Sequence, residues 1–305
     1  MQSFMDALKA QMAFTASEYM IGFLNENSRY NRDNYTQPFL SCFCHDCIGR
    51  GLDINQGGAF YPSAHGACCM GVGTIADSLA AVEWAVFDHK MISLAQLRDA
   101  LKNNFQDNED LRLKLLSAPK YGNNLEYVDK YARWYVSFTY ELFKQYHTPD
   151  GGAVYTAIAA NVQNISSGRE VGATPDGRKS GEPLSDAASP MHGMDKNGPT
   201  AVINSVSKPD YTLVGTGSVV NQKYSPDLFS SDSKRAKLLA LIKTYFKKGG
   251  QEIQINSVSR EILSDAMEHP EKYPSLVVRV SGFSAYYITL GRDVQEDILK
   301  RTEHF

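Results

Sequence analysis

Apolar residues recur every three or four positions over several stretches of the chain, which is the spacing of one face of an α-helix. The opening stretch stops at Gly22 and the polar cluster Asn25-Glu26-Asn27, and Ser93 with Gln96 starts another stretch with a capping box. The pattern predicts helices at Met1–Asn27, Thr74–Phe87, Ser93–Phe105, Glu109–Ser117, Leu125–Gln145, Lys234–Lys247, Ser259–Glu268 and Val294–Thr302.

Short runs of β-branched and aromatic residues lie between these helical stretches and are typical of strands. They are Ala153–Ile158, Thr200–Val206, Gly217–Val220, Ile253–Ile255, Leu276–Val280 and Tyr286–Leu290. Strands spaced among helices predict a mixed α/β architecture. The stretch Gly168–Pro199 is rich in Gly, Pro, Ser and Asp without being of low complexity, and we expect a long ordered loop there.

Composition places the chain among ordinary globular proteins and removes some classes of partner. It has 305 residues, 43% of them hydrophobic, a formal net charge of -3 and a pI near 6.2. Without a basic surface, the sequence gives no electrostatic reason to expect a nucleic acid or an anionic membrane as partner. No apolar stretch is as long as a membrane span, and the N-terminus lacks the features of a secretory signal, so we expect a cytoplasmic protein.

The five cysteines are clustered as Cys42, Cys44 and Cys47 and as the neighbouring pair Cys68-Cys69. An odd, clustered set is unlike the framework of a disulfide-rich secreted domain and indicates a reducing compartment. Three thiols beside His45 could bind zinc, but structural zinc sites usually join two separated ligand pairs. We therefore predict no metal site and favour reduced thiols that pack as small hydrophobic groups, with a radical relay through Cys68-Cys69 as a further alternative.

The C-terminal part of the chain carries a series of short sequence blocks in a fixed order. They are Thr244-Tyr245-Phe246, Gly249-Gly250, Ile253-Gln254-Ile255-Asn256, Ser259-Arg260-Glu261, His269-Pro270-Glu271-Lys272-Tyr273, the run VVRVSGFSAY at Val277–Tyr286, and Arg301-Thr302-Glu303-His304. This series resembles the C-terminal domain of glycyl radical enzymes, the family of pyruvate formate-lyase and of the glycerol, propanediol and choline lyases. The Ser-Gly-Phe-Ser-Ala segment is closer to the dehydratase and lyase branch than to pyruvate formate-lyase.

Upstream blocks match the same family in order, so the resemblance covers almost the whole chain. They are Pro38-Phe39-Leu40-Ser41, Cys47-Ile48, Gly57-Gly58, Ala76-Asp77-Ser78-Leu79-Ala80, Asn104-Phe105, Pro119–Asn123, Ala173–Arg178 and Gly198-Pro199-Thr200. The family fold is a ten-stranded barrel of two antiparallel five-stranded halves surrounded by helices. The resemblance implies that residues 1–230 form the C-terminal half-barrel with its helices, and that residues 231–305 form the glycyl radical domain.

The resemblance identifies Gly282 as the residue that carries the radical. A radical on Cα is stabilised when the carbon flattens and spreads its spin onto the adjacent amide nitrogen and carbonyl, and a side chain would crowd that geometry. In the family, a radical SAM activating enzyme with an iron–sulfur cluster removes one Cα hydrogen, so no cofactor is bound permanently by this chain. The alternative is that Gly282 is an ordinary turn glycine between the two last predicted strands.

Neighbours of Gly282 are expected to support the radical loop. Val280, Phe283 and Ala285 are expected to shield the glycine by packing, and Arg279 and Tyr286 to orient the loop. Ser281 and Ser284 complete the group of supporting residues. On the substrate side, the strand Ala153–Ile158 and the loop Ala159–Ser167 are expected to line the pocket through Tyr155, Ile158 and Asn161.

The cysteine that the family oxidises to a thiyl radical has no counterpart in this sequence. It usually sits in a Gly-Cys-Val-Glu segment, or as a cysteine pair, upstream of the block at Pro38, whereas Cys68-Cys69 lies beyond Gly57-Gly58. We therefore expect a larger partner subunit that carries the N-terminal half and the cysteine loop, in a two-component enzyme. A rescue part for an oxygen-damaged enzyme and a non-catalytic fragment are the alternatives.

The implied activity is that of a radical lyase or dehydratase of an anaerobic bacterium. After abstraction of a hydrogen from a small substrate, a C–C, C–O, C–N or C–S bond breaks. No Arg or Lys lies between Gly151 and Ser167, so we do not expect this half to clamp a carboxylate or sulfonate with arginine. The substrate itself stays open.

Overall fold

The structure is a computed structural model that describes residues 1–22, 24, 29–61 and 64–305. The chain folds as two compact units, Met1–Ala67 with Phe138–Ala157 and Cys68–Ser137 with Ile158–Phe305. Both sides of the expected domain boundary at residue 230 fall within the second unit, and that boundary stays a prediction. No helix in the described ranges is both long and apolar enough to span a membrane.

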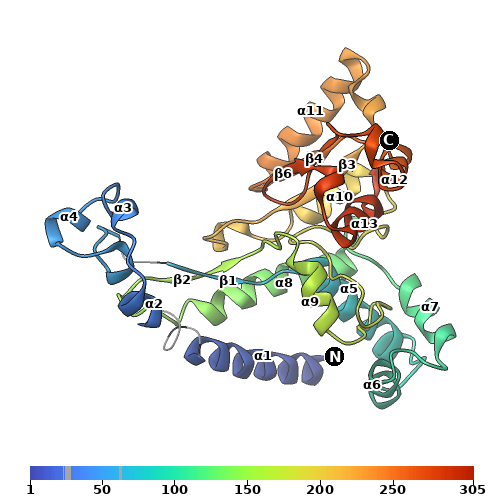
Figure 1. Cartoon of the computed structure of the whole chain (residues 1–305). Coiled ribbons are helices and arrows are strands. Elements are labelled where there is room, and N and C mark those ends of the chain that lie inside the picture. The colour runs from blue at the N-terminus through green and yellow to red at the C-terminus, as the bar shows by residue number, and fades with distance from the viewer. Residues whose placement is uncertain (23, 25–28, 62–63) are drawn as a thin grey trace. The chain divides into compact units, whose positions relative to one another are not determined.

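The first unit consists of one longer helix, α1, and several short elements (Figure 1). Its elements are α1 (Gln2–Gly22), α2 (Arg29–Asn34), α3 (Pro38–Ser41), α4 (Cys47–Arg50), a 3₁₀ turn at Ile54–Gln56, and β2 (Val154–Ala157), which pairs with β1 (His65–Cys68). Asp53 fastens the short elements, because its carboxylate accepts hydrogen bonds from the Gln37 N–H at 2.7 Å and the Ser41 hydroxyl at 2.9 Å. The predicted helix at the N-terminus is confirmed as α1 up to Gly22. Its predicted end at Asn25-Glu26-Asn27 lies outside the described residues.

The second unit is built from helices around short strands. Its helices are α5 (Val72–Val82), which continues as a π-helix over Glu83–Asp88, α6 (Leu94–Lys102), α7 (Glu109–Ser117), α9 (Gln163–Glu170), α10 (Pro199–Val206), α11 (Asp232–Lys247), α12 (Arg260–Glu268) and α13 (Arg292–Lys300). Helix α8 (Glu126–Phe143) belongs to both units. The predicted capping box at Ser93 and Gln96 is present and starts α6.

Three strands of the second unit form a small parallel sheet in the order β4-β3-β7 (Figure 1). They are β3 (Val220–Tyr224), β4 (Ile253–Asn256) and β7 (Glu303–His304), with Val220 opposite Ile253 and Tyr224 opposite His304. The crossover through α11 explains why β3 and β4 are parallel, because a parallel partner needs such a connection. The chain therefore returns to this sheet with its last residues.

The hairpin of β5 (Val277–Arg279) and β6 (Ser284–Tyr286) is antiparallel and packs on α12 and α13. The hydrophobic core beneath it consists of Leu263, Ala266, Val278, Val280, Tyr287 and Ile298. Alternate residues of β5 enter this core, so the hairpin has one buried face. This core fixes the position of the loop between the two strands.

The α/β class is confirmed, whereas the expected antiparallel five-stranded half-barrel is not confirmed by the described strands. They form three small sheets, and the largest is parallel. Two strand predictions are wrong, and a third, Gly217–Val220, overlaps β3 only at Val220. Thr200–Val206 belongs to α10, because Pro199 occupies the first turn and Val202, Ile203 and Val206 are buried at helical spacing. Residues Tyr287–Thr289 form a 3₁₀ turn, and β6 ends at Tyr286.

Candidate functional site

Gly282 lies in the loop that joins β5 to β6. The Val280 N–H donates to the Phe283 carbonyl at 2.8 Å and closes the loop. Gly282 has a φ of +83°, in the left-handed region that glycine adopts without steric cost. A Cβ built on it meets only Asn161 Oδ1 within 4 Å, at 3.7 Å. The glycine is exposed, so its Cα hydrogens are accessible from outside the chain.

The peptide groups on both sides of the Gly282 Cα are bound by side chains. The Gly282 N–H donates to Gln254 Oε1 at 2.9 Å, and Arg279 Nη2 donates to the Gly282 carbonyl at 3.2 Å. Arg279 Nε also donates to Gln254 Oε1, at 3.1 Å. Arg279 thus contacts the glycine, and its role as an orienting residue stays a prediction. The role of Gln254 was missed at the sequence level, where Ile253–Ile255 was interpreted only as a strand.

Other supporting residues divide into buried and exposed ones. Val280 is completely buried, and Ser281 is buried with its hydroxyl 3.3 Å from Asn221 Nδ2. Phe283 and Tyr286 are 40% and 52% exposed, however, and Ser284 is exposed too. Packing within this chain therefore supports the loop from beneath and leaves its outer side uncovered.

The expected pocket residues Tyr155, Ile158 and Asn161 have different surroundings. Tyr155 is 38% exposed on β2 in the first unit, whereas Ile158 is completely buried in the second unit. Asn161 and Val162 precede α9 with φ values of +48° and +67°, a strained pair, and the Asn161 carboxamide oxygen lies beside Gly282. Of the three residues, Asn161 is the one that the structure brings to the glycine.

A buried charge network anchors the loop between β5 and β6 to the C-terminal segment. Arg301 Nη2 donates to the Val280 carbonyl at 2.8 Å and lies 3.5 Å from Asp186 and 3.4 Å from Asp297, while His192 contacts Asp297 at 3.0 Å. Burial acts to raise the pKa of Asp297, but the charges of His192 and Arg301 outweigh it and hold this pKa well below its usual range. Burial raises the pKa of Asp186.

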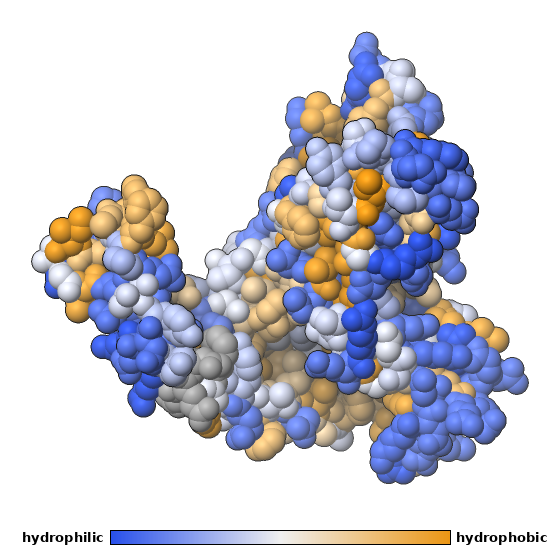
Figure 2. All heavy atoms as spheres, in the orientation of Figure 1, coloured by the Kyte–Doolittle hydropathy of each residue, from blue (hydrophilic) through white to orange (hydrophobic). Residues whose placement is uncertain are grey.

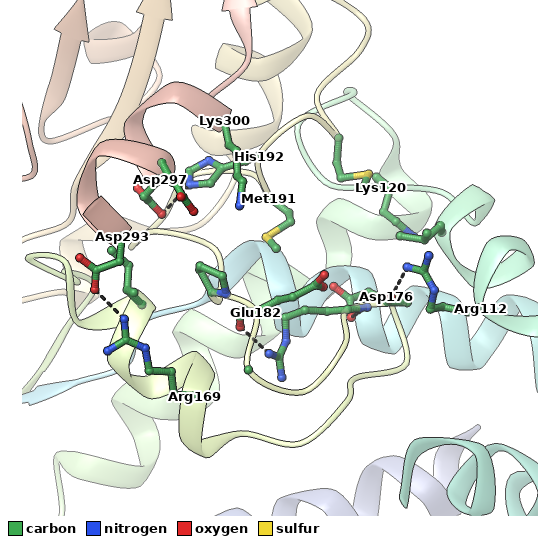
Figure 3. A pocket seen from close by; sticks show the side chains of 18 of the residues that line it. Arg112, Lys120, Arg169, Asp176, Glu182, Met191, His192, Asp293, Asp297 and Lys300 are labelled. Atoms are coloured by element: carbon green, nitrogen blue, oxygen red, sulfur yellow. Dashed lines mark hydrogen bonds and ion pairs between the residues drawn. The ribbon is translucent and has the colours of Figure 1, made fainter. Parts of the chain in front are cut away.

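A cavity of about 630 Å³ lies between α13, α9 and the loop after α9 (Figure 3). Its wall contains charged groups of both signs, and many of them bind one another or backbone carbonyls. Arg169 pairs with Asp293 at 2.6 Å, and the Arg178 guanidinium donates to carbonyls of the surrounding loop, among them that of Glu182 at 2.6 Å. We regard this cavity as part of the scaffold behind α13, because most charged side chains of its wall already bind one another or backbone carbonyls.

All five cysteines are free. Cys47 and Cys69 are buried as expected, whereas Cys42 and Cys68 are exposed. The Cys68 thiol donates to the Ala159 carbonyl at 2.8 Å, and partial desolvation of its sulfur raises the pKa of this thiol although the residue as a whole is exposed. Within the described ranges, no three His, Cys, Asp or Glu side chains are grouped so that they could hold a metal ion.

Comparisons with known proteins agree with this geometry. Residues 1–168 match the pyruvate formate lyase-like family, and residues 184–288 match the glycine radical family, a range that includes Gly282. The chain is 42% identical over 283 residues to a probable dehydratase, YbiW, of Escherichia coli, covering 89% of this chain and 35% of that protein. It is 38% identical over 237 residues to an isethionate sulfite-lyase of Oleidesulfovibrio alaskensis, covering 77% and 29%.

Solved structures show the same relationship in three dimensions. The B12-independent glycerol dehydratase of Clostridium butyricum superposes with a TM-score of 0.95 at 39% identity, over 99% of this chain and 38% of that one. The hydroxyproline dehydratase of Clostridioides difficile superposes with a TM-score of 0.93 at 32% identity, over 99% and 38%. The chain spans between 29% and 38% of the length of these relatives. It belongs to the pyruvate formate lyase-like family of glycyl radical enzymes.

Proposed function

We propose that this chain carries the glycyl radical on Gly282 of a lyase or dehydratase that acts on a small substrate without oxygen. The observation that carries the proposal is the position of Gly282, which is exposed in a loop that its own chain holds on both peptide groups. The match of residues 184–288 to the glycine radical family supports it. The same position also suits a turn glycine, so the test must detect the radical itself.

The proposed chemistry begins with loss of one hydrogen atom from the Gly282 Cα. The C–H bond breaks homolytically, and the hydrogen atom joins a carbon radical supplied by a separate radical SAM activating enzyme with an iron–sulfur cluster. In turnover, the Gly282 radical takes a hydrogen atom from a cysteine thiol, which regenerates the C–H bond and leaves a thiyl radical. That thiyl radical then takes a hydrogen atom from the substrate.

We propose that the cysteine lies in residues outside this sequence, on a larger partner subunit or on the remainder of a longer chain. The short length relative to the relatives supports this, as does the uncovered outer side of the loop, where Phe283 and Tyr286 are exposed. Strands of that partner would complete the small sheets of this chain into the family barrel. Co-purification of the chain with a polypeptide that carries a Gly-Cys-Val-Glu segment tests the proposal, and catalysis by this chain alone would contradict it.

The exposed apolar surface of the first unit also supports a partner. Phe39, Leu40, Phe43 and Ile48 on and around α3 and α4 are between 46% and 80% exposed. Figure 2 shows a hydrophobic area over these two helices. Soluble proteins seldom leave a contiguous area of this kind uncovered, and such areas mark interaction sites.

The proposed substrate is a small polar molecule that loses a leaving group from a carbon next to the one that loses hydrogen. The named relatives act as a glycerol dehydratase, a hydroxyproline dehydratase and an isethionate sulfite-lyase. Their different substrates share this pattern of a hydrogen and a leaving group on adjacent carbons. We infer the same class of substrate, and loss of a leaving group from the neighbouring carbon, for the enzyme that contains this chain.

Electron paramagnetic resonance after anaerobic activation by a radical SAM enzyme tests the radical assignment. We expect a doublet, because the unpaired spin couples to the one hydrogen that remains on Cα, and we expect it to collapse when glycine is deuterated. Exposure to air is expected to cut the backbone at Gly282, giving a C-terminal piece that begins near Phe283 on a denaturing gel. The assignment is contradicted if protein treated with the activating enzyme shows no doublet in its spectrum and also stays whole in air.

A further inference from the structure

Two free cysteines of the first unit stand at the two ends of one turn. Cys44 and Cys47 are separated by His45 and Asp46, which form the turn, and Asp46 has a φ of +73°. The first and fourth Cα atoms of a turn lie within about 7 Å of each other. A disulfide joins Cα atoms about 4.4–6.8 Å apart, so the backbone already brings this Cys-x-x-Cys pair to nearly the distance that a disulfide needs.

Contacts outside the turn fix its backbone. The Asp46 carboxylate pairs with Arg50 at 3.3 Å, and the His45 carbonyl accepts a hydrogen bond from the Phe60 N–H at 3.0 Å. The chain therefore meets the entropic cost of bringing the two thiols together when it folds. A bond between them forms within one chain more readily than a bond between two chains.

The two thiols also act on each other. Burial raises the pKa of the Cys47 thiol, and the charge of Cys44, the charge of Asp53 and a hydrogen bond with the Cys44 thiol raise it further. The charge of Arg50 opposes these effects without outweighing them. The thiolate of Cys47 is therefore not stabilised by its surroundings. Because a stabilised thiolate favours the reduced form of a dithiol, this pair lacks that protection against oxidation.

The two cysteines differ in how easily a small molecule reaches them. Cys44 is partly exposed, whereas Cys47, the first residue of α4, is 2% exposed. An accessible thiol beside a covered one is the arrangement in which an oxidant attacks the outer sulfur and the inner sulfur then resolves the product.

We propose that Cys44 and Cys47 form a modification site at which hydrogen peroxide produces a reversible disulfide. The Cys44 sulfur attacks one oxygen of the peroxide, the O–O bond breaks, and Cys44 becomes a sulfenic acid while the other oxygen leaves with the thiol proton as water. The Cys47 sulfur then attacks the sulfenic sulfur, the S–O bond breaks, and the sulfenic hydroxyl leaves with the Cys47 proton as a second water. Two electrons thus pass from the two thiols to the peroxide, and a dithiol reductant reverses the change by exchange.

The pair lies within the exposed hydrophobic surface of the first unit. Phe43 directly precedes Cys44, Ile48 directly follows Cys47, and both apolar side chains are exposed. A disulfide fixes the turn that separates these two side chains. Oxidation therefore changes the surface that the proposed partner would cover, and it does so whether or not Gly282 carries a radical.

The test treats the purified full chain with hydrogen peroxide and then counts its free thiols in denaturant. We expect the count to fall from five to three and to return to five after addition of dithiothreitol. Mapping the bond is straightforward, because trypsin releases two peptides that contain cysteine, residues 33–50 and residues 51–90. Labelling with N-ethylmaleimide before digestion should leave the first peptide with a single label, at Cys42, and the second with both of its cysteines labelled.

Variants identify the two partners of the bond. Cys44→Ser should abolish the loss of two thiols, and Cys47→Ala should leave Cys44 as a sulfenic acid that reacts with dimedone. Cys42→Ser is the matched control, because Cys42 is the exposed cysteine of the same peptide, and this variant should still lose two thiols. A thermal melt shows whether each variant is folded, and if Cys47→Ala is not, Cys44→Ser carries the test because its position is partly exposed.

The outcomes decide the proposal. A disulfide that maps to Cys44 and Cys47 and is reversed by dithiothreitol supports it. Five free thiols after peroxide treatment, a disulfide that involves Cys42, Cys68 or Cys69 instead, or an oxidation that dithiothreitol does not reverse overturns it. A folded Cys44→Ser variant that loses as many thiols as the wild type also overturns it. Each of these results leaves the radical assignment to Gly282 as it was.

Discussion

At the residue scale, Gly282 combines an accessible Cα with a backbone angle that other residues adopt at a cost. Its φ of +83° was not readable from the sequence. Space is not the obstacle, because a Cβ would meet only Asn161 Oδ1 in ordinary contact. An alanine at this position therefore tests the radical and strains the backbone at the same time, and the two effects must be separated.

Gly282→Ala is expected to abolish the doublet and the cleavage in air, and to cost about 1–2 kcal/mol of stability from the left-handed backbone. Gly249→Ala is the matched control, since Gly249 has a φ of +96° with nothing within 4 Å of an added Cβ. We expect similar losses in free energy of unfolding for both variants, measured in urea, and loss of the radical only for Gly282→Ala. A doublet that persists in Gly282→Ala would show that another residue carries the radical.

At the scale of elements, helices were easier to predict than strands because their end signals are local. Ser93 and Ser259 cap α6 and α12 as their sequence contexts indicate, and Glu109–Ser117 matches α7 at both ends. Thr200–Val206 misled because its β-branched residues favour strands, whereas Pro199 and the burial pattern produce a helix. The pairing of β3 with β7 joins residues far apart in sequence, so no local pattern could announce it.

The residues of the candidate site also divide into those that a local sequence segment indicated and those that only the packing of strands brings together. Gly282, Arg279 and Val280 were found because they occur together in one recognisable segment. Gln254 was not assigned a role, since its contact with the Gly282 N–H depends on how β4 lies beside β5. The one available signal was the alternation in β4, which buries the carboxamides of Gln254 and Asn256 on the same side, and buried amides need partners.

Helix α13 depends on Asp297 for its attachment, which leads to a pH prediction. The pKa of Asp297 is lowered in the folded state, so the carboxylate contributes stability above its unfolded pKa near 4, and this contribution is lost as the pH falls towards the folded pKa. Asp297→Asn is expected to cost roughly 3 kcal/mol at neutral pH, as removal of one partner from a buried pair does. The difference in free energy of unfolding between the wild type and Asp297→Asn should become smaller below about pH 4.

Urea unfolding of both proteins between neutral and acidic pH measures this gap. Asp293→Asn is the control, because Asp293 pairs with Arg169 at the surface, where a salt bridge contributes little. A gap between wild type and Asp297→Asn that stays constant down to the lowest accessible pH contradicts the assigned role of the Asp297 charge.

At the scale of the whole molecule, the first unit has an exposed hydrophobic surface that the proposed partner would cover. Phe43 and Ile48 are 72% and 74% exposed. We expect the isolated chain to bind a hydrophobic fluorescent dye and to self-associate in size-exclusion chromatography, and the double variant Phe43→Ser/Ile48→Ser to do both less. Leu113→Ser on α7, where Leu113 is 53% exposed, serves as the control. A monodisperse wild-type chain without dye binding contradicts this role of the surface.

The return of the chain end to the sheet of β3 has a consequence for protein that oxygen has damaged. The residues after Gly282 form three elements: β6 pairs with β5, α13 packs on α12, and β7 pairs with β3. Arg301, which follows α13, also contacts Asp186. A nicked chain therefore keeps its severed end by non-covalent contacts and retains its native size. Such a molecule would still occupy the place of an intact one in the proposed complex, and each complex that it enters would lack the radical.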